Sequence, residues 1–233
     1  MILLLGLLLH VVAGTCHSPA IRDTSATVEL ATVGSFKVTV DGKPAGWERF
    51  ELIDAGTDRV RAKSSGEITS LGQSRKITTL VDVQSGRVTR YSAEVVERSE
   101  TRKWEIQFER NNARVHLEVG GRTSDRNVRV DSDVILLDRD VWHHYRFLLN
   151  RYSMTRQGRQ AFRVLSPQAA LRAMIAEVEF EGTTNIGPST NRRRANKFTV
   201  TLAGGFEVKV MADEDGSPLS IDVPSVGQKV VLE

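Results

Sequence analysis

The pair His143-His144, followed by Tyr145, comes closest to metal chemistry in this sequence, because imidazole is the commonest protein ligand for zinc. Both histidines fall in a stretch with helical periodicity, where adjacent residues point about 100° apart and rarely share one ion. Ligand pairs on a helix need a spacing of three or four residues instead. We therefore expect no metal site and no cofactor, and we expect both histidines to lie on the helix surface or at a rim.

No nucleophile in the sequence has the neighbours that hydrolytic catalysis requires. The Gly-x-Ser-x-Gly elbow is absent, and the nearest serine, Ser74 in Gly72-Gln73-Ser74-Arg75, lacks the second glycine. The only cysteine, Cys16, stands where an export signal would be cut. Carboxylates fall at turns and on polar faces. Whether two of them form a catalytic pair of the kind found in glycosidases stays open. We predict no catalytic residues and keep a hydrolase with an unrecognised site as the third functional hypothesis.

The densest basic cluster consists of Arg192, Arg193, Arg194 and Lys197. The net charge of the whole chain is only +3 and is spread along the sequence, which does not favour nucleic acid as a partner. For an exported protein the available anions are lipid head groups and lipopolysaccharide phosphates. These four side chains are our candidates for anionic head-group contact, and a solvated surface loop is the alternative.

The N-terminal residues have the pattern of a secretory signal peptide, which we place at residues 1–20. Met1 to Val12 form an apolar run that is followed by small residues. A transmembrane anchor is the alternative, but a span takes about 20 apolar residues. Ala13-Gly14-Thr15-Cys16 partly matches the box at which bacterial lipoproteins are lipidated, and plain secretion with Cys16 trimmed or incidental is the other interpretation. We predict an exported protein of the periplasm or cell envelope, bound to the membrane only if Cys16 carries a lipid.

From Thr24 onward, short runs alternate between polar and apolar residues and are separated by Gly, Asp, Asn and Ser. This pattern indicates antiparallel strands with one solvated face. The clearest inward sets are Phe36, Val38 and Val40, and Trp104, Ile106 and Phe108. Turn signals recur about every 8–12 residues, which is typical of a sandwich, barrel or large meander. We expect one β-rich domain over residues 21–233, with Trp47 and Trp104 in its core and a surface loop near 182–196.

The segment Asp138 to Tyr152 is the one stretch with helical periodicity. Its apolar residues recur at helical spacing, and Asp140 could cap its first turn. We predict a helix near 140–152 and a large antiparallel sheet curled around it, because a sheet of roughly ten or more strands curls or splits. Leu148 and Leu149, in the middle of the helix, should then be largely buried.

The organisation of the chain resembles the half-barrel proteins of the bacterial envelope, including lipoprotein carriers and the β-spiral envelope-integrity proteins. The shared features are a signal peptide, a meander with Asp-containing turns, and a short helix inserted before a second set of strands. The resemblance covers roughly residues 25–230. It implies a half-barrel or β-spiral sheet that binds acyl chains or peptides between sheet and helix.

The leading functional hypothesis is a non-enzymatic envelope protein that binds a lipid, another hydrophobic ligand or a peptide in a groove between helix and sheet. A modest supply of aromatic side chains spread over many strands could leave such a groove unfilled. The candidates for lining it are Trp142, Tyr145, Leu149 and Ala176. The alternative is a structural or interaction module of the envelope that holds no small ligand.

Overall fold

The computed structural model describes residues 31–70, 72–187 and 192–233. Their strands are β1 (Ala31–Val40), β2 (Lys43–Asp54), β3 (Arg59–Ser70), β4 (Gln73–Gln84), β5 (Arg87–Glu97), β6 (Glu100–Glu109), β7 (Asn112–Val119), β8 (Arg122–Arg129), β9 (Ile135–Leu136), β10 (Arg159–Ser166), β11 (Ala170–Ile186), β12 (Arg193–Leu202), β13 (Phe206–Ala212), β14 (Pro218–Val223) and β15 (Gln228–Leu232). The helices are α1 (His144–Leu149) and a short 3₁₀ turn, η1 (Pro224–Val226).

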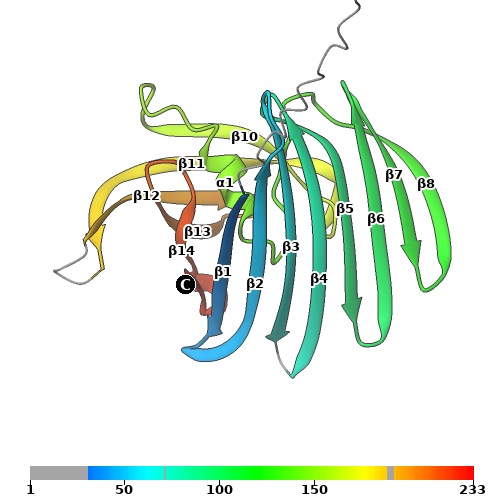
Figure 1. Ribbon diagram of the computed structural model, residues 1–233, viewed down its shortest axis with the longest axis horizontal. Coiled ribbons are helices and arrows are strands. Elements are labelled where there is room, and N and C mark those ends of the chain that lie inside the picture. The colour runs from blue at the N-terminus through cyan, green and yellow to red at the C-terminus, as the bar shows by residue number, and fades with distance from the viewer. Residues whose placement is uncertain (1–30, 71, 188–191) are drawn as a thin grey trace, which may run out of the picture.

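All strands of the described residues belong to one sheet of 15 strands, in the order β8 to β1 followed by β15 to β9. Successive strands within β1–β8 and within β10–β15 pair antiparallel, and β1 joins the two halves of the sheet by pairing with β15. The short β9 adds to β10 in parallel. In Figure 1, β1–β8 form a curved wall, while β10–β14 run across it on one side with α1 in between. The predicted all-β class, with a large curled sheet around one short helix, is confirmed.

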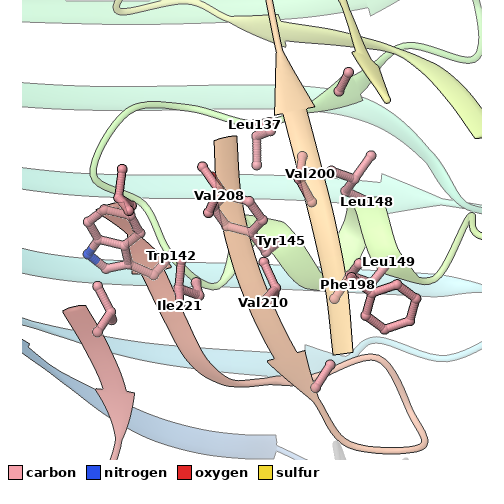
Figure 2. Packing of buried hydrophobic residues seen from close by; sticks show 14 of the residues in the cluster. Leu137, Trp142, Tyr145, Leu148, Leu149, Phe198, Val200, Val208, Val210 and Ile221 are labelled. Atoms are coloured by element: carbon pink, nitrogen blue, oxygen red, sulfur yellow. The ribbon is translucent and has the colours of Figure 1, made fainter. Parts of the chain in front are cut away.

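The segment that carries α1 is enclosed on both sides by apolar side chains. Val134, Leu136 and Val141 pack into a cluster with residues of β2–β7 and Leu165 of β10. Tyr145, Leu148 and Leu149 instead pack with β1 and β10–β15 in a second cluster, part of which is drawn in Figure 2. Leu148 and Leu149 are 0% and 4% exposed, so the prediction that they are buried is confirmed. The helix is therefore a core element of the fold.

The regular helix is shorter than the predicted 140–152. The α-helical hydrogen bonding covers His144–Leu149 only, and Asp140 has a positive φ of 59°, which a helix does not allow. Tight turns flank the helix, with bonds from Tyr145 N to Trp142 O and from Tyr152 N to Leu149 O. Asp140 does not cap the helix, because its carboxylate binds Arg75 of β4 instead.

The surface loop predicted near 182–196 is wrong, because most of that segment is strand. β11 continues to Ile186 and β12 begins at Arg193, with Thr183 opposite Asn196 and Asn185 opposite Arg194. Alternation is lost there because the side chains are largely solvated, while the backbone ladder still supplies hydrogen bonds. Residues 188–191, between these strands, lie outside the described part of the chain.

A β-bulge in β2 reverses the expected direction of Trp47. The pairing of β1 with β2 shifts between Val38 and Thr39, which leaves Ala45 as an extra residue in β2. One extra residue moves every later side chain to the opposite face. Trp47 is therefore 40% exposed, contrary to the prediction of a core position, whereas Glu48 turns inward and is 2% exposed. Trp104 is buried as expected.

Candidate functional site

A groove with a volume of about 820 Å³ lies between α1 and one end of strands β2–β5. Its apolar lining comes from both the sheet and the helical segment, and consists of Leu52, Val60, Val83, Val88, Val134, Ile135 and Phe147. Phe147 contacts both hydrophobic clusters and is only half-buried, so part of its ring is left to line the groove. The chain thus contains a groove between helix and sheet, on the Phe147 side of the helix.

Five charged side chains stand along the same groove: Asp54, Asp58, Arg59, Arg146 and Arg151. Arg146 is half-buried and the other four are exposed. Among the described residues none of the five belongs to an ion pair within 4.0 Å. Arg151 is held in place by a 3.4 Å contact from Nη1 to the carbonyl oxygen of Gly86. The groove therefore combines an apolar floor with unpaired charges of both signs.

A buried carboxylate in β2 fixes the start of the helical segment. Glu48 Oε2 accepts hydrogen bonds from the backbone N–H of Trp142 at 2.8 Å and of His143 at 3.3 Å. Its Oε1 lies 2.8 Å from Nδ1 of His143. These N–H groups precede α1 and have no helical partner, so Glu48 satisfies them in place of a local cap.

A second buried carboxylate, Asp138, ties the segment before α1 to the other side of the core. It accepts hydrogen bonds from the hydroxyl groups of Tyr91 at 2.5 Å and Ser166 at 2.8 Å, and from the side-chain amide of Gln168 at 2.8 Å. Burial raises the pKa of the Asp138 carboxyl, and these hydrogen bonds offset part of that rise. Burial, followed by the charge of Asp138, raises the pKa of Tyr91 well above its ordinary value. Arg75 also joins the network through Gln168.

Both histidines are in the core, so their predicted position on the helix surface is wrong. His143 is 1% and His144 is 0% exposed, because hydrophobic clusters cover both sides of the segment. His144 Nδ1 accepts the backbone N–H of Asp138 at 3.2 Å, so its Nε2 carries the proton of the neutral ring. Burial, and then the proximity of His143, lower the pKa of His144 well below its ordinary value. Neither Nε2 atom has a partner among the described residues.

This polar network holds the helical segment rather than lining the groove. Glu48, Asp138, His143 and His144 are not part of the groove lining, which the segment reaches only at Arg146, Phe147, Asn150 and Arg151. Across the described residues no group of three or more His, Cys, Asp or Glu is placed to hold a metal ion. Sequence reasoning missed the network because a β-bulge reverses which residues of β2 face inward, and this turns Glu48 into the core. A bulge leaves no periodic signal in the sequence.

All four predicted groove residues are buried, and none of them lines this groove. Trp142, Tyr145 and Ala176 are buried in the cluster of β1 and β10–β15 and do not line the groove. Leu149 borders a second, smaller cavity of about 210 Å³, together with Tyr152, Met154 and Phe198. The sequence signal for the observed groove was present at Phe147, which is apolar but lies off the main helical stripe.

The predicted head-group residues stand on β12 and just before it. Arg192, Arg193 and Arg194 are exposed and Lys197 is half-buried, so their charges are available at the surface. They are not part of the groove lining. The predicted lipidation residue, Cys16, lies outside the described residues. None of the helices in the described ranges is both long and apolar enough to cross a membrane.

Comparison with known proteins gives one distant structural similarity. No family model and no curated protein matches the chain. Among solved structures, a DUF1089 family protein from Pseudomonas aeruginosa shares 14% sequence identity over 78% of this chain and 90% of that chain, with a TM-score of 0.48.

Proposed function

We propose that this chain is a non-enzymatic, exported envelope protein that binds a lipid or another hydrophobic ligand in the groove between α1 and β2–β5. The groove itself is the observation that carries the proposal. Its volume of about 820 Å³ falls in the range of about 300–1,000 Å³ that is usual for small-ligand sites. The buried residues of its lining, Leu52, Val83, Val134 and Ile135, are all apolar. Each methylene group that leaves water against them contributes about 0.8 kcal/mol.

The buried network supports a binding role because it makes the groove preformed. Glu48 and Asp138 hold the segment on which Phe147 and Arg146 lie, so little ordering is left to occur on binding. A preorganised site loses less conformational entropy to its ligand than a mobile one. Export rests on residues 1–20, and contact with an anionic membrane surface would use Arg192, Arg193, Arg194 and Lys197.

Mass spectrometry of an organic extract tests the proposal directly. Protein purified from envelope preparations without detergent should release acyl-chain lipid, and delipidated protein should bind a fluorescent fatty acid. Val88→Trp, which places a large ring in the groove, should abolish that binding. Val33→Trp is the matched control, because Val33 is 74% exposed and does not line the groove.

Clean extracts together with no uptake of the fatty acid by the folded wild type would overturn the proposal. The alternative of a structural or interaction module, with an envelope protein or peptide as partner, would then be the better hypothesis. Equal loss of binding in Val33→Trp and Val88→Trp would show that the ligand does not bind in the groove.

A further inference from the structure

We propose that the groove selects a zwitterionic amphiphile, whose apolar chain lies on the apolar lining, whose phosphate meets Arg146 and whose ammonium meets Asp54 and Asp58. This inference rests on the proposed function and names its ligand class. It comes from charges of both signs that line the groove beside apolar side chains and that form no ion pair within 4.0 Å among the described residues.

The charges along the groove come from two sides. Arg146, the neighbour of Phe147 in α1, is half-buried, and Arg151 follows the helix. Asp54 and Asp58 stand at the end of β2 and in the turn that follows, beside Arg59, and all three are exposed. A ligand lying in the groove would therefore meet guanidinium groups on the helix side and carboxylates on the sheet side. A ligand that carries both an anion and a cation matches these charges of both signs.

Arg146 is the anion-binding residue of this arrangement. The residue is half-buried, lines the groove and forms no ion pair among the described residues, so its charge is available to a ligand anion. A guanidinium binds phosphate through two parallel hydrogen bonds, which an ammonium cannot do. Arg151, which contacts the Gly86 carbonyl, adds positive charge at the same end of α1.

Asp54 and Asp58 supply the cation-binding part. One oxygen of Asp54 accepts the Gly56 N–H at 3.0 Å, which fixes the carboxylate over the turn and leaves its other oxygen free of any described partner. Neither aspartate pairs with the arginines of the groove, so both carboxylates remain available to an ammonium. An anionic ligand without the ammonium would instead be repelled by them.

Displacement of a bound fluorescent acyl probe measures the selectivity. The competitors are lysophosphatidylethanolamine and lysophosphatidylglycerol with the same acyl chain, used below their micellar concentrations, and the protein is the full mature chain. Because an exposed ion pair contributes about 0.2–1 kcal/mol, we expect the ethanolamine lipid to bind up to about fivefold more tightly.

Two sets of variants separate the two charge sites. The double variant Asp54→Asn with Asp58→Asn should remove the preference for the ethanolamine lipid. Binding of the ethanolamine lipid should become weaker, and binding of the glycerol lipid should become tighter. Arg146→Gln should lower the affinity for both lipids about tenfold. The controls carry equal charge changes on the outer face: Glu207→Gln with Asp222→Asn for the carboxylates, and Lys209→Gln for the arginine.

The outcomes distinguish this inference from the proposed function. If both lipids displace the probe equally, or if the aspartate variants leave the preference unchanged, the groove binds acyl chains and the zwitterionic assignment is wrong. If the probe itself does not bind to folded wild type, the proposed function fails. A preference that the outer-face controls abolish as well would also overturn the assignment, because long-range charge would then account for it.

Discussion

Oε1 of Glu48 lies 2.8 Å from Nδ1 of His143, although 95 positions separate the two residues in the chain. Both side chains are almost fully buried, at 2% and 1% exposure. The same carboxylate accepts two backbone N–H groups ahead of α1, so one side chain of β2 anchors the start of the helical segment. The position of the groove depends on this contact, because the groove uses the other end of the same segment.

Replacing Glu48 should destabilise the protein strongly. Glu48→Ala leaves the N–H groups of Trp142 and His143 and the ring of His143 without their buried acceptor, and breaking such a contact costs about 3–5 kcal/mol. Urea unfolding measures the loss. The control Glu94→Ala removes an exposed carboxylate and should change stability by about 0.5 kcal/mol or less. A loss below about 1 kcal/mol for Glu48→Ala would show that the contact does not hold the segment.

Truncating the helix core should also be costly. Leu149 is 4% exposed, and a buried leucine changed to alanine typically costs about 2–5 kcal/mol. Ile175→Ala is the comparison variant. Because Ile175 is 49% exposed, this variant should lose far less stability. An unchanged melting temperature for Leu149→Ala would mean that the helix only rests on the surface.

The buried His144 should make stability fall in acid. Its pKa is well below 6.5 in the folded protein, so below pH 6.5 the unfolded chain binds a proton that the folded chain does not. This difference should remove about 1.4 kcal/mol of stability between pH 7.5 and 5.5. Asp138, whose folded pKa is raised, contributes with the opposite sign at lower pH, since its protonation favours the folded state.

The contribution of His144 is isolated by comparison with a variant that cannot titrate there. His144→Gln keeps Asp138 and the exposed His116, so their pH dependences cancel in the difference. Urea unfolding at both pH values should show a smaller acid loss for His144→Gln than for wild type. Parallel curves for the two proteins would mean that His144 is protonated to the same extent in the folded and unfolded states.

The bulge in β2 should tolerate no side chain at Gly46. A Cβ at this position would lie 2.1 Å from the backbone carbonyl oxygen of Glu67, and neither strand can shift without disturbing its ladder. Gly46→Ala should therefore cost about 1–3 kcal/mol, as overpacking does. Ser65→Ala, an exposed change on the neighbouring strand, serves as the control in thermal unfolding. Equal stability of the two variants would contradict the close approach.

Export is tested with residues 1–20 alone. Fused to a reporter that is active only outside the cytoplasm, this segment should give activity, and a cytoplasmic result from a verified start codon would refute export. If Cys16 is lipidated, the full chain should partition into membranes, and Cys16→Ser should release it. Unchanged partitioning of Cys16→Ser would exclude lipidation as the cause.

Local periodicity was enough to predict the class of fold. Phe36 and Val38, or Trp104 and Ile106, alternate with polar residues because successive side chains of a strand point to opposite faces, and a core on one side selects the apolar set. The burial of Leu148 and Leu149 followed in the same way from helical spacing. These predictions hold because each depends on residues close together in the chain.

Other features were decided only by the tertiary structure, because they depend on contacts between residues that are distant in the chain. The bulge at Ala45, which turns Glu48 inward and Trp47 outward, is set by the pairing of β2 with β1, and no pattern within β2 shows it. His143 and His144 are both buried because two sets of strands enclose the helix, whereas a helix on a surface would bury one face only. The groove lies beside Phe147 for the same reason, since a gap between packed elements is a property of their arrangement and not of either element.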